Sequence, residues 1–179
     1  APSVGAPRPD PYSTLALSMV AASRLRFLDR SFPMMVVSVE DVLRMRTIEP
    51  HEVLAGKRLL KEWKPGMGQV SFVSHTWLRN THPDKDGVKL RLLQLFLRCV
   101  LEGGMQIDVH YLQTLTFGAR TLDRQDLQHS FKGSFIWLDY WSIPQFDRGT
   151  QLQAIHSIPS YIGDSAFFVC LVPAVVHES

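Results

Sequence analysis

Residues 69–77, Gln-Val-Ser-Phe-Val-Ser-His-Thr-Trp, decide the fold class, because an apolar run ends abruptly in hydrogen-bonding residues. Two further segments have a similar pattern: 134–139, Ser-Phe-Ile-Trp-Leu-Asp, and 165–172, Ser-Ala-Phe-Phe-Val-Cys-Leu-Val. Both faces of these segments are apolar, which is typical of strands buried in a parallel sheet. Helices are expected between them, at 86–102 and at 150–162, the second bent or broken by Pro159. We therefore predict an α/β fold with three layers, in which helices flank a mostly parallel central sheet.

The chain before residue 69 is expected to form an arm and an extension. Residues 1–12 contain four prolines, so we predict an extended arm there. Residues 13–68 are expected to form a mainly helical extension that also contains a short strand. Its predicted elements are a helix from Ser13 or Thr14 to about Asp29, a strand at 34–38, a helix through Met45 capped by Ser38, and a helix from Pro50 to about Trp63.

The α/β domain is expected to occupy residues 69–179. Its last apolar strand lies only a few residues before the end of the chain, so we expect this domain to be incomplete at its C-terminus. Residues 103–133 show no clear periodicity and are assigned no element.

Composition excludes several classes of protein. The chain has 179 residues, of which 45% are hydrophobic and 20% are charged, as in an ordinary globular domain. A formal net charge of +2 gives no reason to expect a nucleic-acid partner. No apolar run approaches the roughly 18–20 residues that a transmembrane helix needs. The two cysteines, Cys99 and Cys170, lie in apolar runs and are expected to be buried free thiols. Unpaired thiols favour a reducing, intracellular and cytoplasmic location, with an organellar location left open.

Candidate ligand-binding residues cluster where the predicted parallel strands end. The carboxyl ends of such strands meet at one edge of the sheet, which is where α/β folds bind ligands. Ser74 and His75 offer polar contacts, Trp77 offers a ring for stacking, and Asp139 offers a carboxylate for a sugar hydroxyl or for acid/base chemistry. Structural roles remain an open alternative: strand-end hydrogen bonds for Ser74, His75 and Asp139, and core packing for Trp77. The full candidate pocket is Ser74, His75, Trp77, Arg79, Asp139, Trp141 and Gln145.

No metal site is predicted. The seven histidines are scattered, no pair of them has the spacing of a metal-binding helix, and the sequence contains no Cys-x-x-Cys. Glycine-rich phosphate loops and nucleophile elbows are also absent from the sequence.

Taken together, residues 69–173 resemble the Toll/interleukin-receptor (TIR) domain and its relative, the fungal heterokaryon-incompatibility (HET) domain. The resemblance implies that the central sheet is TIR-like and flavodoxin-like. The segment 70–77, Val-Ser-Phe-Val-Ser-His-Thr-Trp, is similar to the first strand of both groups. The segment 136–145, Ile-Trp-Leu-Asp-Tyr-Trp-Ser-Ile-Pro-Gln, resembles a HET motif, with Ser142 where that motif usually has cysteine. Gly149, the step at 154–157 and the strand at 167–169 follow in the TIR order. The long segment 103–133 departs from a compact TIR domain.

The resemblance implies two kinds of function. Some relatives hydrolyse NAD with a glutamate on the helix after the third strand, whereas others only self-associate as signalling adaptors. That glutamate would lie beyond residue 173, where the sequence offers only Glu178. We therefore favour an interaction module without a catalytic glutamate, whose partners are other protein chains, including further copies of itself, and which needs no cofactor. An NAD-hydrolysing or nucleotide-sensing domain, with NAD as substrate or ligand and its catalytic helix beyond residue 179, is the alternative. A structural subunit of a larger complex is a further one.

Overall fold

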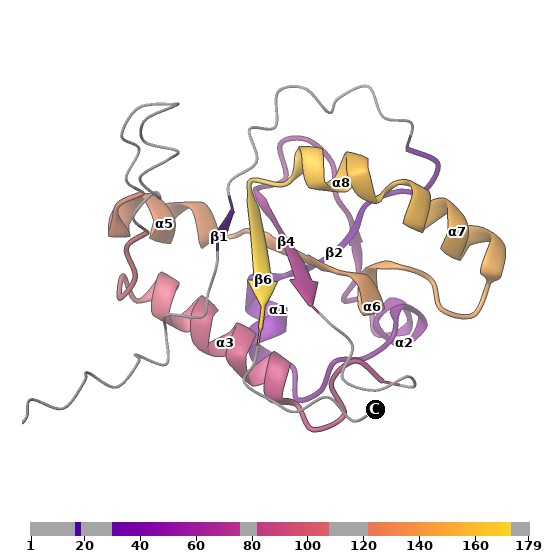
Figure 1. The fold of residues 1–179 in the computed structure, drawn as a ribbon, viewed down its shortest axis with the longest axis horizontal. Coiled ribbons are helices and arrows are strands. Elements are labelled where there is room, and N and C mark those ends of the chain that lie inside the picture. Colours follow the sequence, from indigo (N-terminus) through magenta and orange to yellow (C-terminus); the bar gives the residue numbers. More distant parts are fainter. Residues whose placement is uncertain (1–16, 19–29, 76–81, 108–121, 173–179) are drawn as a thin grey trace, which may run out of the picture.

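The computed structural model describes residues 17–18, 30–75, 82–107 and 122–172, and its strands form one mixed sheet (Figure 1). The strand order is β1-β6-β4-β5-β2-β3. The strands span Leu17–Ser18 (β1), Met35–Ser38 (β2), Lys61–Glu62 (β3), Val70–His75 (β4), Phe135–Leu138 (β5) and Phe167–Leu171 (β6). No helix in the described ranges is long and apolar enough to cross a bilayer.

The three apolar segments form the centre of the sheet, as predicted. β4 pairs in parallel with β5, with Val70 opposite Phe135, and in parallel with β6, with His75 opposite Leu171. On one face the ring of Phe72 stacks on Trp137 of β5, with 4.2 Å between centroids, and on Phe168 of β6, at 5.2 Å. This row of rings fastens the three strands side by side. The parallel arrangement is confirmed for these strands only, because β1, β2 and β3 pair antiparallel with their neighbours.

Helices cover both faces of the sheet, which confirms the α/β layering. One face packs against α1 (Val39–Arg44), α2 (His51–Gly56), α3 (Val88–Leu101) and α5 (Arg124–Phe131). The other face packs against α7 (Arg148–His156) and α8 (Ile158–Asp164), through Ala154 and Tyr161. Pro159 lies in the first turn of α8, so the predicted break in this helical segment is confirmed. The short helix α6 (Asp139–Ser142) follows β5 directly.

The N-terminal extension differs from the prediction because it contributes two further strands, β1 and β3, besides the predicted one. β2 and α1 are confirmed, and the Ser38 hydroxyl accepts a hydrogen bond from the Asp41 N–H as the cap of α1. The helix expected from residue 13 is wrong at Leu17–Ser18, which pair with β6 as β1. The edge of β6 needs a hydrogen-bonding partner, and this pairing outweighs the local helical pattern. The rest of that predicted helix and the arm at 1–12 lie outside the described residues.

The helix predicted from Pro50 to Trp63 ends at Gly56, because the next turn closes it. The N–H of Arg58 donates to Ala55 O and the N–H of Leu59 donates to Leu54 O, each at 3.0 Å. These are the two bonds of a Schellman motif, which places Arg58 in the left-handed position that glycine prefers. Its φ is 59°, the one positive φ at a non-glycine residue in the described part of the chain. Beyond this turn the chain extends into β3.

Replacing Arg58 with glycine should stabilise the protein by about 0.5–1 kcal/mol. A left-handed residue with a Cβ costs about 1–2 kcal/mol, and the greater unfolded-state entropy of glycine offsets part of the gain. The measurement is the free energy of unfolding from urea denaturation. Ala55→Gly, at an exposed position inside α2, is the control and should destabilise by about 0.5–1 kcal/mol. A loss of stability in R58G would contradict the conclusion that the left-handed conformation strains Arg58.

Candidate functional site

The carboxyl end of β4 lies at the switch point of the parallel strands. The chain passes from β4 to β5 through α3 and α5 on one face of the sheet, and from β5 to β6 through α7 and α8 on the other. The two crossovers therefore lie on opposite faces of the sheet, and β4, between β6 and β5, lies where the strand order reverses, which is where doubly wound sheets bind ligands. His75 is the last residue of β4, and Asp139 follows β5. Topology alone places both residues at the same edge.

His75 and Asp139 form a hydrogen bond across this edge. The distance from His75 Nε2 to Asp139 Oδ1 is 2.8 Å. The His75 side chain is 1% exposed, whereas that of Asp139 is 32% exposed. The same Oδ1 accepts the N–H of Tyr140, the next residue of α6, at 2.6 Å. Asp139 thus joins a buried imidazole to a partly open surface.

Lys89 approaches the opposite side of the His75 ring. Its Nζ lies 3.2 Å from His75 Nδ1, and the side chain is completely buried in the first turn of α3. Burial lowers the pKa of Lys89 below its usual value, and the negative charges of Asp84 and Asp139 oppose this effect. Lys89 therefore connects the start of α3 with the ends of β4 and β5.

His75 and Lys89 cannot both be cations in this contact, because the hydrogen bond between Nδ1 and Nζ needs one acceptor. If the Lys89 ammonium donates to Nδ1, His75 is neutral and its Nε2–H donates to Asp139. If His75 is an imidazolium, Lys89 has to be a neutral amine that accepts from Nδ1–H. Two positive charges would leave this contact without an acceptor. Nδ1 and Nζ therefore share one proton in this contact.

Asp84 fixes the helix that carries Lys89. Its two carboxylate oxygens accept the N–H groups of Lys89 at 3.0 Å and of Leu90 at 2.9 Å, and the side chain is almost fully buried. His82 stabilises this turn: Nδ1 accepts the Asp84 N–H, so Nε2 carries the proton and donates to Ile48 O at 3.1 Å. The segment His-Pro-Asp-Lys thus opens α3 and aims Lys89 at His75.

The other predicted pocket residues occupy different places. Alternation along β4 puts Ser74 on the face of Phe72, opposite to the face of His75. Trp141 is completely buried in the core on the α3 side. Gln145 donates from its amide to Ile143 O at 2.7 Å and closes the turn after α6. Trp77 and Arg79 lie outside the described residues. Of the predicted set, the structure brings together His75 and Asp139.

Lys89, Asp84 and Glu52 are polar residues that sequence reasoning did not assign to the site. Lys89 did leave a signal, because it lies four residues before Leu93 and seven before Phe96, on the apolar stripe of the predicted helix. A charged residue on such a stripe needs a buried partner. Glu52 gave no comparable signal, since it lies in a short helix and accepts hydrogen bonds from a distant loop.

The chemistry available here is hydrogen bonding at a partly exposed carboxylate. Asp139 presents a partly exposed carboxylate, and His75 and Lys89 share one proton behind it. Within residues 30–75, 82–107 and 122–172, no three His, Cys, Asp or Glu side chains come together as metal ligands.

Lys89→Met should remove part of the increase in stability with pH. Because the pKa of folded Lys89 lies below the unfolded value of 10.5, the unfolded chain binds more protons between these two values. The free energy of unfolding of the wild type should therefore rise relative to K89M as pH approaches 10.5. Denaturant titrations at several alkaline pH values measure this difference. Lys85→Met, at an exposed lysine, is the matched loss of charge and should follow the wild type. Parallel curves for the wild type and K89M would contradict the assignment.

Comparisons with known proteins give no match, so a function can be proposed only from the sequence motifs and the geometry of the site. No family model, curated protein or solved structure matches the chain. The resemblance to TIR and HET domains therefore stays a prediction that depends on the motif residues themselves.

Proposed function

We propose that the chain is a TIR-like or HET-like protein-interaction module that associates with a second copy of itself. The observation that carries this proposal is the exposure of Phe146. Its side chain is 79% exposed, more than that of any other large hydrophobic residue in the described part of the chain. Its backbone is nevertheless fixed: Glu52 Oε1 accepts the Phe146 N–H at 3.0 Å and the Gln145 N–H at 2.6 Å. An aromatic ring on a fixed backbone loses little entropy on binding and is the kind of residue that dominates interfaces.

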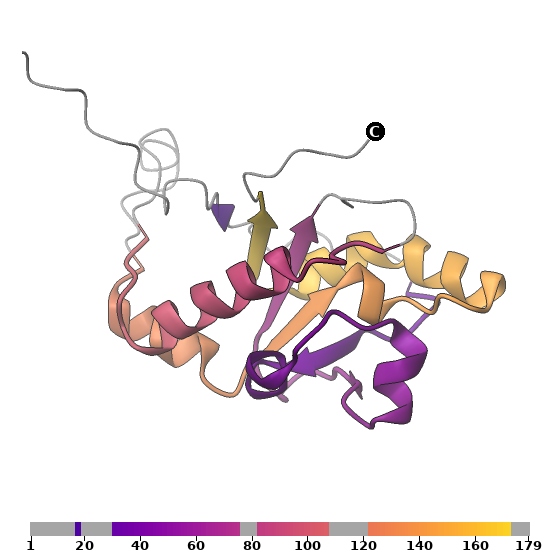
Figure 2. The ribbon, with the colours of Figure 1, turned by 90° about the horizontal axis from the view of Figure 1, so that it is seen from below.

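Helix α7 extends the apolar surface that begins at Phe146. Leu152 and Ile155 are each 39% exposed and lie three residues apart, so they share one face of this helix. Figures 1 and 2 both show α7 reaching away from the strands at one end of the molecule. This position leaves the helix accessible to another chain. We call Phe146, Leu152 and Ile155 the α7 surface.

The charges around the α7 surface favour a second copy as the occupant. The sequence from Arg148 to Gly163 contains no carboxylate, and Arg148 is its one permanent charge. If two copies of α7 pack antiparallel, Asp147 at the start of each helix lies near His156 at the end of the other. Opposite ends of the two helix dipoles then also meet. In such an isologous contact both copies use the same surface, and like charges are not brought together.

The order of the parallel strands supports the proposed relationship to TIR-like and flavodoxin-like sheets. The strand with the first motif, β4, lies between β5 and β6, the second and third parallel strands along the chain. The order second-first-third is that of the first three strands in flavodoxin-like folds. The two motif segments end side by side, at His75 and Asp139.

Phe146→Asp should weaken self-association at least 10-fold, because a charge replaces the aromatic anchor. Sedimentation velocity over a range of concentrations measures the effect, with the wild type gaining mass as concentration rises. Leu95→Asp introduces the same charge on α3, at a residue 49% exposed, and should leave association unchanged. A wild type that remains monomeric at every concentration would refute self-association through this surface.

A nucleotide-binding domain is the second candidate, favoured by Asp139, which follows β5 beside the switch-point strand β4 and has a partly exposed side chain. A ribose hydroxyl donating to this carboxylate would bind in the way such edges recognise nucleotides. ADP-ribose should then bind in calorimetry, and Asp139→Asn should weaken binding about 10-fold by removing a charged acceptor. Asp126→Asn, on α5, is the control. Release of nicotinamide from NAD would add turnover, whereas the absence of heat with both NAD and ADP-ribose would exclude this candidate.

A further inference from the structure

A cavity of about 500 Å³ lies on the α1 and α2 side of the molecule, remote in the chain from the α7 surface. Its volume is within the range of small-molecule sites. It opens between the end of α1, the segment that follows it and the end of α2. The lining residues are Asp41, Arg44, Met45, Arg46, Thr47, Glu49, Lys57 and Leu59.

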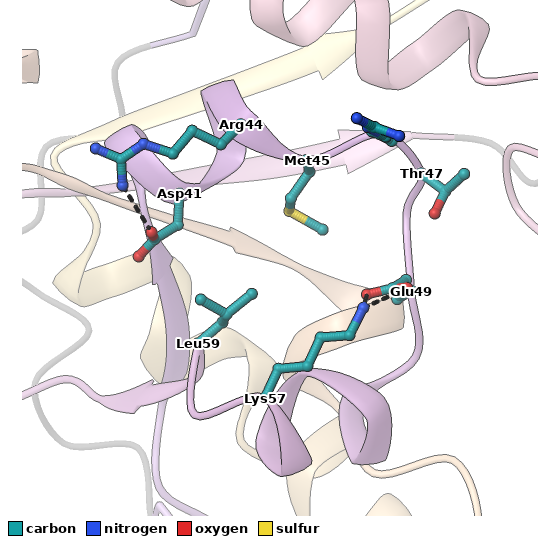
Figure 3. Close-up of a pocket in the computed structure, with 8 residues that line it drawn as sticks. Asp41, Arg44, Met45, Thr47, Glu49, Lys57 and Leu59 are labelled. Atoms are coloured by element: carbon teal, nitrogen blue, oxygen red, sulfur yellow. Dashed lines mark hydrogen bonds and ion pairs between the residues drawn. The ribbon is translucent and has the colours of Figure 1, made fainter.

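The cavity combines an apolar floor with charged sides. Figure 3 shows Met45 and Leu59 pointing into the space between two ion pairs. Both apolar side chains are partly buried and rest on the core beneath. A ligand with an apolar part can therefore cover them and remove apolar surface from water.

The acidic side chains of the cavity already have cationic partners. Both carboxylate oxygens of Glu49 accept from Lys57 Nζ, at 2.8 and 2.6 Å. Asp41 accepts from the Ser38 hydroxyl at 2.6 Å and pairs with Arg44 at 3.4 Å. Arg46 is exposed and makes no hydrogen bond or ion pair with another described residue. Three cations against two carboxylates leave one positive charge, which belongs to Arg46.

The backbone on both sides of Arg46 is held in place. The Gln94 side-chain amide donates to Val42 O at 2.9 Å and to Met45 O at 2.8 Å, which fixes the end of α1 to α3. Ile48 is buried, and its carbonyl accepts from His82. Arg46 is therefore presented from a rigid segment, so that binding an anion costs mainly the ordering of its own side chain.

We propose that this cavity binds a small organic carboxylate. Its carboxylate accepts a bidentate pair of hydrogen bonds from the Arg46 guanidinium. Its apolar part covers Met45 and Leu59. A singly charged group matches the single positive charge of the cavity, whereas a phosphate dianion would leave an excess negative charge beside Asp41 and Glu49.

Four probes test the class of ligand: benzoate, acetate, phenyl phosphate and benzyl alcohol. Amide chemical shifts of the full chain are followed during titration at low salt. Benzoate should bind with a Kd of about 0.1–1 mM, the range that a ligand of this size reaches. Acetate should bind more weakly because it lacks the ring, and benzyl alcohol more weakly because it lacks the charge. No binding of benzoate overturns the proposal, and tighter binding of phenyl phosphate overturns the assignment of a carboxylate.

Substitutions then locate the bound anion. Arg46→Gln should weaken benzoate binding about 10-fold, and Arg46→Lys should weaken it less, because the charge stays and the bidentate fork is lost. Arg98→Gln removes an exposed arginine from α3 and is the matched control for the loss of charge. Because Arg46 is exposed, these variants should fold, which their unbound spectra will show. Equal weakening by R46Q and R98Q would mean a general charge effect and would overturn the site.

Discussion

The hydrogen bond between His75 and Asp139 joins the ends of β4 and β5 above the buried Lys89, and the docking of α3 on the sheet depends on it. Lys89 cannot leave water at low cost unless acceptors and negative charges surround it. His75 supplies the acceptor, while Asp84 and Asp139 supply the charges. Asp84 in turn requires the N–H groups at the start of α3. Each polar group is thus buried because the others are, and removal of one leaves its partner unsatisfied. These hydrogen bonds therefore define the position of α3 on the sheet more narrowly than apolar contacts would.

The central sheet was predictable from the sequence because its physical cause is local. Strands that are covered on both faces need apolar residues on both faces, and three such runs separated by helical patterns leave few arrangements other than parallel pairing. The meeting of His75 and Asp139 follows from the same topology, since both residues come at the end of a strand. Lys89 was harder to place because its role depends on how α3 rotates against the sheet. Trp141 and Gln145 lie close to Asp139 in sequence, yet the tight turn of α6 sends the indole into the core and the amide onto backbone carbonyls.

The N-terminal half shows where local patterns stop being sufficient. β1 and β3 are two residues long, so neither has enough residues to show the alternation of a strand. Both exist because an edge of the sheet offers hydrogen bonds: β6 to Leu17–Ser18, and β2 to Lys61–Glu62. Leu59 and Leu60 continue the apolar spacing of α2, which favours a longer helix, but the left-handed turn at Arg58 redirects them toward the core. Pairing and packing between residues distant in sequence therefore override helix propensity in this part of the chain.

The polar network at the switch point also explains why the two proposed binding surfaces lie elsewhere. An edge that usually opens to ligands is occupied here by the protein's own lysine and histidine, so Asp139 alone of these three side chains is substantially exposed. Residues at the two ends of α2 contact the α7 surface and the carboxylate cavity instead. Glu52 in its first turn fixes the backbone of Phe146, and Lys57 at its end holds Glu49 at the carboxylate cavity. A six-residue helix is about 9 Å long. The α7 surface and the cavity therefore contact opposite ends of one short element, the first through Glu52 and the second through Lys57.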